Sequence, residues 1–394
     1  MTQRSLMSTS TIQLPASKSI SNRVLMIRAL TATPAEVSNL SECEDTQVLQ
    51  KALSSNDKEI DLKASGTALR FLTAYYAVTP GIHRLTGCQR LMERPMVPLI
   101  DALRQLGASI DFTTCGEPRG IVIRGSHLMG GQVVMRGDVS SQFVSAMLLI
   151  GPILPLGLQI DLVGRVVSRP YIELTLHLMR TFGADARFAS TNRLLVSPGK
   201  YQARSYTVEA DWSAASYWYA MMGLNKRFHF CFPDLTPDSL QGDRIVVELM
   251  RHKGDVLAHE FTDTPDIVPT MAVYCVLKGI HFEFSGLQGL RLKETDRLTA
   301  LRTELTKWGY RVSATDSTLC WHGERCEGSD EPIETYGDHR MAMSFAIGAV
   351  AGKPVRIAHP EVVNKSYPHF WDNLRTIGFD VTNINNFELR LFAS

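Results

Sequence analysis

The chain has 394 residues. This length exceeds what a single hydrophobic core usually holds together, so we expect two domains. Its 44% hydrophobic and 21% charged residues are typical of a folded globular protein and exclude a disordered or fibrous chain. The formal net charge of +1 gives no overall field for nucleic acid or an anionic membrane, and we expect neither as a partner. Any selectivity for anions must therefore come from local clusters of charge.

The sequence favours a cytoplasmic protein. Residues 1–13 are polar and lack the apolar segment of a signal peptide. The seven scattered cysteines fit reduced thiols better than a disulfide framework. The uncharged run 143–160 is long enough to span a bilayer, but Gly151, Pro152 and Pro155 interrupt it. We therefore predict a buried helix, a turn and a buried strand in this run.

The first motif in chain order, residues 14–23, predicts a helix that begins near Lys18, after a strand end marked by Pro15. Ser19 and Arg23 would share one face of this helix. Two cations and a hydroxyl at a helix N-terminus, where free N–H groups favour negative charge, suit an anionic ligand. A capped helix with solvated basic side chains is the alternative. The positions expected to face a core are Ile20, Val24 and Ile27.

Two classes of helix recur along the chain. One class ends in a leucine- or methionine-rich turn followed by a glycine, which supplies the left-handed residue after a helix. The other opens on an aspartate and continues almost wholly apolar, which predicts a helix buried on all sides. Their alternation with strands predicts repeated α/β units around buried helices, although any α/β protein has helices that end in glycine. The glycines are Gly107, Gly183, Gly254, Gly309 and Gly378, a sixth helix is expected near residues 46–53, and the aspartates are Asp138, Asp211 and Asp338.

Ser140, Ser141 and Gln142 would lie in the first turn of a helix, where they offer two hydroxyls, an amide and free N–H groups. Such donors suit a phosphate or the hydroxyls of a polyol, and helix capping is the alternative. Lys293 and Arg297 are like charges four residues apart near a predicted helix start. They repel each other, and positive charge at a helix N-terminus also interacts unfavourably with the helix dipole. A bound anion would remove both conflicts, with neighbouring Glu294 as a tuned acid or a counter-ion.

Further charged residues occupy similar places, and together they predict a small, multiply anionic substrate held between domains. The cations at expected helix N-termini are Lys18, Arg23, Arg94, Lys293, Arg297, Arg340 and Lys365, and the remaining carboxylate at such a point is Asp266. The sequence contains no dinucleotide or P-loop fingerprint. Cys320, His322 and Cys326 lack a second cluster that would complete a metal site, so we expect no metal.

These motifs, in this order, resemble those of the 5-enolpyruvylshikimate-3-phosphate synthase family from Leu14 to about Phe370. The resemblance implies an α/β fold of two domains, an inside-out α/β barrel with six repeated α/β units and buried helices. We therefore expect a discontinuous domain of residues 1–13 and 226–394 and an inserted domain of residues 14–225. The motifs are 14–23, 65–70, 93–95, 140–143, 168–171, 265–266, 293–297 and 338–343.

The resemblance also implies the reaction. In that family the carboxyvinyl group of phosphoenolpyruvate is transferred to the 5-hydroxyl of shikimate 3-phosphate, phosphate is released, and no metal or organic cofactor takes part. We expect a monomer. The alternatives are a UDP-N-acetylglucosamine enolpyruvyl transferase, whose expected reactive cysteine has no match in the context of Cys88 or Cys115, and a non-catalytic phospho-metabolite sensor.

By the same resemblance, Asp266 would be the base on the 5-hydroxyl, Glu294 would exchange a proton with the substrate methylene, and Lys18 would also be catalytic. The expected shikimate 3-phosphate ligands are Lys18, Ser19, Arg23, Ser140, Ser141, Gln142, Ser168, Tyr171, Asp266 and Lys293. The expected phosphoenolpyruvate ligands are Lys18, Gly66, Arg94, Gln142, Arg297, Arg340 and Lys365.

The chain departs from the family pattern at four positions and in a short segment before residue 64. Ala64 replaces an asparagine that would supply a side-chain donor, and Phe71 replaces a proline. Gly289 and Gly337 each replace an asparagine. These departures bear on affinity and on glyphosate sensitivity more than on the class of reaction.

Overall fold

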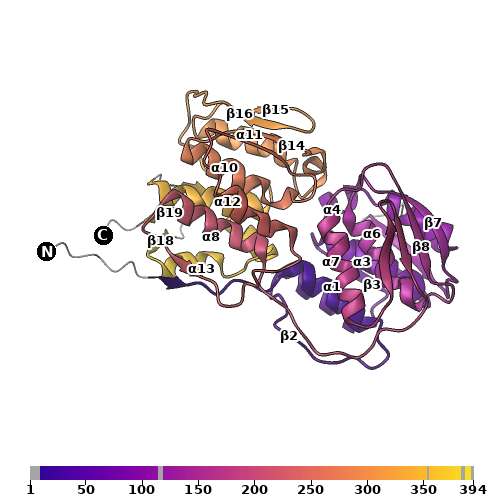
Figure 1. Cartoon of the computed structure of the whole chain (residues 1–394). Helices are drawn as coiled ribbons and strands as arrows, with labels where there is room; N and C mark the ends of the chain where they lie inside the picture. Colours follow the sequence, from indigo (N-terminus) through magenta and orange to yellow (C-terminus); the bar gives the residue numbers. More distant parts are fainter. Residues whose placement is uncertain (1–8, 114–118, 353–354, 383–386, 392–394) are drawn as a thin grey trace. The chain divides into compact units, whose positions relative to one another are not determined.

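The computed structural model describes residues 9–113, 119–352, 355–382 and 387–391. Its contacts divide the chain into two compact units (Figure 1): a discontinuous unit of residues 1–15 and 210–394, and an inserted unit of residues 16–209. The first boundary, at 15/16, lies two residues beyond the expected one at 13/14, and the second, at 209/210, differs from the expected one at 225/226. The reason is that helix α8 (Trp212–Leu224) buries Trp218 and Met221 in the core of the discontinuous unit.

The inserted unit contains two complete copies of one β-α-β-α-β-β repeat. In each copy the first two strands are parallel and the other pairings are antiparallel, giving the orders β3-β4-β6-β5 and β7-β8-β10-β9. The first copy consists of β3 (Glu59–Asp61), α3 (Gly66–Val78), β4 (Gly81–Thr86), α4 (Gln89–Glu93), α5 (Val97–Gln105), β5 (Ser109–Phe112) and β6 (Gly120–Gly125). The second consists of β7 (Gly131–Arg136), α6 (Ser141–Ile150), η1 (Gly151–Ile153), β8 (Leu158–Val163), α7 (Arg169–Thr181), β9 (Ala186–Ser190) and β10 (Arg193–Val196).

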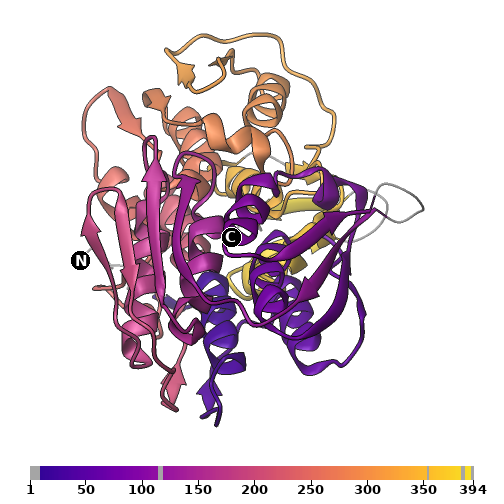
Figure 2. The same cartoon turned by 90° about the vertical axis from the view of Figure 1, so that its right-hand side faces the viewer.

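A third repeat of this unit is shorter, with a two-stranded parallel sheet of β2 and β11. Its elements are α1 (Lys18–Ala29), β2 (Val37–Ser38), α2 (Glu44–Ser54) and β11 (Tyr206–Thr207). Figure 2 shows the two four-stranded sheets of the inserted unit, in purple and magenta, in front of its helices. Helices α1, α3 and α6 bury most of their residues, so their N-terminal turns are held in place by packing on several sides.

The discontinuous unit repeats the same arrangement. Its complete sheet has the order β13-β14-β16-β15, again with a parallel first pair, and a smaller sheet has the order β17-β19-β18. Helices α8, α10 and α12 lie side by side in its core (Figure 1). The elements are β1 (Ser10–Thr11), α8, β12 (Phe230–Cys231), η2 (Gly242–Ile245), α9 (Val246–Leu249), β13 (Val256–Glu260), η3 (Pro265–Ile267), α10 (Val268–Lys278), β14 (His281–Ser285), η4 (Gln288–Leu292), α11 (Arg297–Lys307), β15 (Ser313–Ala314), β16 (Leu319–Trp321), α12 (His339–Ala346), η5 (Ile347–Ala351), β17 (Val355–Ile357), η6 (Pro360–Lys365), α13 (Phe370–Thr376), β18 (Phe379–Thr382) and β19 (Phe387–Leu391).

Most of the expected helix ends are confirmed. Four of the five glycines have the left-handed backbone, with φ of +93° at Gly107, +86° at Gly183, +82° at Gly309 and +91° at Gly378. The prediction was wrong for Gly254, because α9 ends at Leu249, well before this glycine. The uncharged run 143–160 is a buried helix, a turn and a strand, as expected. Within the described ranges, none of the helices combines the length and apolar character needed to cross a bilayer.

Two of the three expected aspartate caps are also confirmed. Asp211 accepts a hydrogen bond from the backbone N–H of Ala214 at 2.9 Å, and Asp338 accepts one from Arg340 N–H at 3.0 Å. Asp138 does not cap α6. Ser140 does so instead, because Asp138 is held by the guanidinium of Arg136 through two contacts of 2.9 Å.

Candidate functional site

The predicted site residues fall into both units, and each unit gathers its share at the N-terminal ends of its buried helices. In the discontinuous unit they form an acid–base cluster, in which three carboxylates and four cations contact one another. The acid–base cluster consists of Asp266, Lys293, Glu294, Arg297, Asp338, Arg340 and Lys365. The η3 turn, which leads into α10, carries Asp266, while α11 and α12 carry the two arginines in their first turns.

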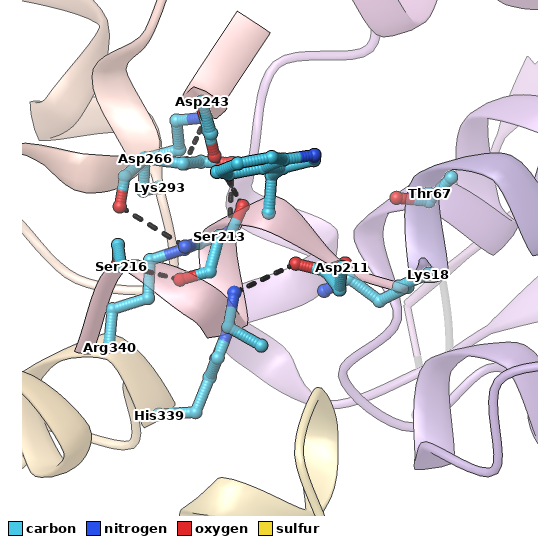
Figure 3. A network of polar contacts seen from close by, with 12 residues as sticks. Lys18, Thr67, Asp211, Ser213, Ser216, Asp243, Asp266, Lys293, His339 and Arg340 are labelled. Atoms are coloured by element: carbon cyan, nitrogen blue, oxygen red, sulfur yellow. Dashed lines mark hydrogen bonds and ion pairs between the residues drawn. The ribbon is translucent and has the colours of Figure 1, made fainter. Parts of the chain in front are cut away.

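Asp266 is the centre of the acid–base cluster. Its Oδ1 accepts from Lys293 Nζ at 3.2 Å and from Arg297 at 2.9 Å, and its Oδ2 accepts from Arg340 at 3.1 Å. Figure 3 shows Asp266 with Lys293 and Arg340. Burial alone would raise its pKa, but Arg340, Lys293 and Arg297 outweigh that effect and hold the pKa of Asp266 well below its usual range. Asp266 is therefore an ionised carboxylate at neutral pH, able to accept a hydrogen bond or a proton.

Arg297 is the most deeply buried cation of the cluster, with a side chain only 1% exposed. Its Nε donates to Asp338 Oδ2 at 2.7 Å, and another guanidinium nitrogen donates to Glu294 Oε2 at 3.0 Å. Burial would lower the pKa of Arg297, yet the three carboxylates around it, Asp338 first, raise that pKa above its ordinary value. A guanidinium so buried is tolerated because it is fully paired.

Glu294 lies between two cations of the acid–base cluster. Lys365 Nζ is 3.4 Å from Glu294 Oε1, on the side opposite the Arg297 contact with Oε2. With all members ionised, four positive and three negative charges leave the cluster with a net charge of +1. This residual charge favours an anion, and Asp266 and Glu294 offer two carboxylates in different surroundings for acid and base duties.

The structure also resolves the charge conflict expected at residues 293–297. Lys293 and Arg297 do not lie on one helix, because α11 begins at Arg297 and Asp296 caps it by accepting from Thr299 N–H at 3.2 Å. Moreover, the carboxylates of the chain itself pair with these cations. An anion that binds here must therefore compete with Asp266 for its partners.

In the inserted unit, two guanidinium groups converge on Gly66, the first residue of α3. A Cβ at this position would lie 2.5 Å from a terminal nitrogen of Arg94 and 2.7 Å from one of Arg70, so only glycine leaves room for both. Arg70 also donates to the Gly66 carbonyl at 2.9 Å. Gln142 on α6 reaches the hydroxyl of neighbouring Thr67 at 3.3 Å. The start of α3 thus combines free N–H groups, two cations and an amide, a typical anion-binding arrangement.

Arg23 extends into the core of the inserted unit instead of into solvent. Its guanidinium donates to the hydroxyls of Thr175 at 2.7 Å and Ser145 at 3.1 Å and to the carbonyl of Ser19 at 2.8 Å. Burial lowers the pKa of Arg23 to about 10. Arg23 ties α1 to α6 and α7, and it contacts the carbonyl of Tyr171 at 3.3 Å.

Several other predicted residues occupy the expected helix starts, but the expectation was wrong for Arg94, which is the C-cap of α4, and for Lys365, which is the last residue of η6. Lys18 is the first residue of α1 and pairs with Asp45 of α2 at 3.1 Å. Ser140 caps α6, and Ser141 begins that helix. Ser168 precedes α7 with a left-handed φ of +53°, unusual for a residue with a side chain and often found at functional sites.

Sequence reasoning missed some members of these clusters. Asp338 was expected only to open a helix, yet it also holds Arg297. Arg70 was noted only as part of a motif, and the partner of Lys18, Asp45, was not singled out. The one signal in the sequence that could have pointed to Asp45 is its place in the first turn of an amphipathic helix. Among the described residues, no group of three or more metal-ligating side chains is placed to hold a metal ion.

Comparison with known proteins identifies the family. The model of EPSP synthase (3-phosphoshikimate 1-carboxyvinyltransferase) matches residues 5–55, 47–263 and 251–374. A Bacteroides fragilis protein named 3-phosphoshikimate 1-carboxyvinyltransferase is 46% identical over 392 residues, covering 94% of this chain and 96% of the relative. This chain belongs to the EPSP synthase family. A relative of the same name from Cellvibrio japonicus is 33% identical, covering 92% of this chain and 95% of its own length.

The family's fold is confirmed by solved structures. An EPSP synthase from Acinetobacter baumannii matches with a TM-score of 0.70 at 20% identity, covering 93% of this chain and 95% of that one. A second structure from the same organism gives a TM-score of 0.71 at 19% identity, with 98% and 97% covered. The expectation of an EPSP synthase fold, with two domains of repeated α/β units and buried helices, is thereby confirmed.

Two of the departures from the EPSP synthase pattern have a structural explanation. Gly337 has a φ of +67°, a left-handed conformation that glycine and asparagine both tolerate, so glycine replaces asparagine there without strain. Phe71 is fully buried, and its ring lies 5.6 Å from the guanidinium carbon of Arg23. The aromatic ring thus packs against the cation that links α1 to its neighbours.

Proposed function

We propose that this chain transfers the carboxyvinyl group of phosphoenolpyruvate to the 5-hydroxyl of shikimate 3-phosphate and releases phosphate. The observation that supports this best is the acid–base cluster, in which an ionised aspartate and a separate glutamate are held among four cations. Two phosphates and a carboxylate need such neutralisation, and addition followed by elimination needs two proton-transfer groups.

In the proposed chemistry, a proton is added to the methylene carbon of phosphoenolpyruvate while the 5-hydroxyl oxygen bonds to the adjacent carbon. Asp266 takes the hydroxyl proton, and Glu294 supplies the proton to the methylene. In the second step the phosphate leaves with its bonding electron pair, and the methyl group returns a proton to Glu294. The ionised state of Asp266 supports its assignment as the base. Glu294, which pairs with Arg297 and Lys365, must first bind a proton before it can supply one to the methylene carbon.

The binding roles follow the same proposal. The proposed shikimate 3-phosphate ligands are Lys18, Ser19, Arg23, Ser140, Ser141, Gln142, Ser168, Tyr171, Asp266 and Lys293. Phosphoenolpyruvate would be held by Lys18, Gly66, Arg94, Gln142, Arg297, Arg340 and Lys365. The Arg94 and Arg70 guanidiniums around Gly66 support a phosphate at the start of α3. A monomeric state and a cytoplasmic location stay predictions from the sequence.

Phosphate release tests the proposal. The full chain is incubated with phosphoenolpyruvate and either shikimate 3-phosphate or UDP-N-acetylglucosamine, and the products are identified by mass spectrometry. We expect phosphate and the enolpyruvyl ether with shikimate 3-phosphate alone. Product with the nucleotide sugar instead would identify the other enolpyruvyl transferase activity, and binding without product would identify a sensor.

A further inference from the structure

Asp243 is a buried carboxylate that the proposed mechanism does not use. It lies in η2 of the discontinuous unit and is only 2% exposed. The hydroxyl of Ser213, in the first turn of α8, donates a hydrogen bond to its Oδ2. Figure 3 shows Asp243 with Ser213, Asp266 and Arg340 in the same network. A buried carboxylate in this position requires an explanation.

The chain around Asp243 is fixed to the start of α8 by its neighbour Gln241. The Gln241 side chain accepts from Trp212 N–H at 3.1 Å and donates to the Ala210 carbonyl at 2.8 Å. The Gln241 N–H in turn donates to Ser239 Oγ at 3.0 Å. With the Ser213 contact, these bonds hold the Asp243 carboxylate in one place beside the acid–base cluster.

The charged groups that face Asp243 come from three neighbouring elements. They are Asp266 of η3, Arg340 of α12 and Asp211, the N-cap of α8. Burial first, and then the negative charge of Asp266, raise the pKa of Asp243 to about 6, while Arg340 and the Ser213 hydrogen bond oppose the rise. Arg340 also binds Asp266 directly, at 3.1 Å from its Oδ2, and the positive charge of Arg340 acts on Asp243 as well.

The charge of Arg340 links the protonation of Asp243 to the binding of an anion at the acid–base cluster. With Asp243 protonated the acid–base cluster and Asp243 together carry +1, and with Asp243 ionised they carry zero. An anion that pairs with Arg340 both adds a negative charge and withdraws the cation that stabilises ionised Asp243. Binding of an anion must then favour the protonated form of Asp243.

We propose that Asp243 is a positioning residue that takes up one proton from solvent when an anionic substrate group pairs with Arg340, which keeps the cluster from becoming too negative to hold both substrates. The identity of the substrate rests on the proposed function, but the proton uptake does not. Neutral Asp243 leaves Arg340 to the substrate and leaves Asp266 as the ionised carboxylate beside it.

Calorimetry measures this proton uptake directly. The full chain is titrated at pH 7 with sulfate, which has no proton equilibrium near this pH, and separately with phosphoenolpyruvate, in buffers of different ionisation enthalpy. We expect the wild-type chain to take up a larger fraction of a proton per ligand than Asp243→Asn, which is isosteric and cannot titrate. Asp238→Asn, an exposed aspartate on the preceding loop, is the matched control and is expected to behave as wild type.

Ser213→Ala is a second, independent test, for which the direction of the change in proton uptake can be stated. Loss of the hydroxyl donor raises the pKa of Asp243 in the unliganded chain, so the pH range of proton uptake shifts upward. Equal uptake by wild type and Asp243→Asn, or an unshifted range in Ser213→Ala, would overturn the inference. Sulfate binding with the expected uptake but no binding of phosphoenolpyruvate would contradict the proposed function and leave the role of Asp243 standing.

Discussion

At the scale of single residues, Asp266 has two opposed tasks. It neutralises three cations while the cluster holds no substrate, and it is the proposed base when substrates are bound. Its three cations keep it ionised, but they also make it a weak base. Substrate anions that draw these cations away would raise the basicity of Asp266 at the moment when a base is needed.

Asp266→Asn is expected to lower kcat by about 10²- to 10⁴-fold, because a general base of this kind contributes about that much. The same change raises the net charge of the cluster from +1 to +2, so inorganic phosphate is expected to bind more tightly. Steady-state kinetics and phosphate titration measure the two effects. Asp263→Asn, an exposed neighbour, is the control. Unchanged kcat in Asp266→Asn would exclude it as the base.

Gly66→Ala tests the anion site at the start of α3. The new Cβ would collide with the ends of the Arg94 and Arg70 side chains, which are flexible and can move, so the fold is expected to survive. We expect the KM for phosphoenolpyruvate to rise about tenfold or more, equivalent to about 1.4 kcal/mol of binding free energy. Gly199→Ala, where a Cβ meets nothing within 4 Å, is the matched control. A KM equal to that of the control would contradict this assignment.

At the scale of elements, the buried helices of the discontinuous unit are joined by a line of hydroxyls. Thr270 of α10 contacts Ser216 of α8 at 3.3 Å and Ser344 of α12 at 3.2 Å. These contacts fix the helices whose first turns carry or adjoin Asp266, Ser213 and Arg340. The geometry of the acid–base cluster therefore depends on packing a helical turn away from it.

Thr270→Val removes this hydroxyl at nearly constant volume. The buried hydroxyls of Ser216 and Ser344 then lose Thr270 as a hydrogen-bond partner. The free energy of unfolding is expected to fall by about 1–3 kcal/mol. Denaturant unfolding measures the loss. Thr306→Val, an exposed threonine of α11 whose hydroxyl donates to the Arg302 carbonyl, is expected to change stability by no more than about 0.5 kcal/mol. Equal losses in the two variants would show that the hydroxyl line does not stabilise the core.

The sequence predicted elements better than the partners of its charged residues. The helices after Lys18, Asp211 and Asp338 were predictable because their caps and apolar positions are local signals. The pairing of Arg297 with Asp338 was not, since 41 residues separate them and only the tertiary fold brings the first residue of α11 into contact with the N-cap of α12. The cap of α6 was misplaced because Arg136 competes for Asp138.

At the scale of the whole molecule, one repeat explains why so many charged residues sit at helix starts. Each complete repeat delivers the N-terminus of a buried helix from the end of its first strand, as β3 does for α3 and β13 for η3 and α10. Apolar packing determines the repeat, and the turn before the helix is free to carry charge. The boundary at Ala210 follows the same logic, since α8 belongs with the core that it fills.

The stability of the whole chain should report the charge of Asp243 through its pH dependence. Its pKa of about 6 in the folded chain lies above the ordinary value of 3.8, so the folded state binds more protons and loses stability as pH rises from about 4 to 6. Asp243→Asn lacks this penalty. Its free energy of unfolding relative to wild type, measured by denaturant unfolding at each pH, is expected to increase over that range and to plateau above it, the gain reaching about 3 kcal/mol at most. A pH-independent difference would contradict the raised pKa.

Product formation by the full chain from phosphoenolpyruvate and shikimate 3-phosphate, followed by phosphate release and mass spectrometry, is the decisive experiment for the proposed reaction. We expect one phosphate for each enolpyruvyl ether formed, with turnover lost in Asp266→Asn and kept in Asp263→Asn. Absence of product with this acceptor, or an equal rate in the two variants, would contradict it.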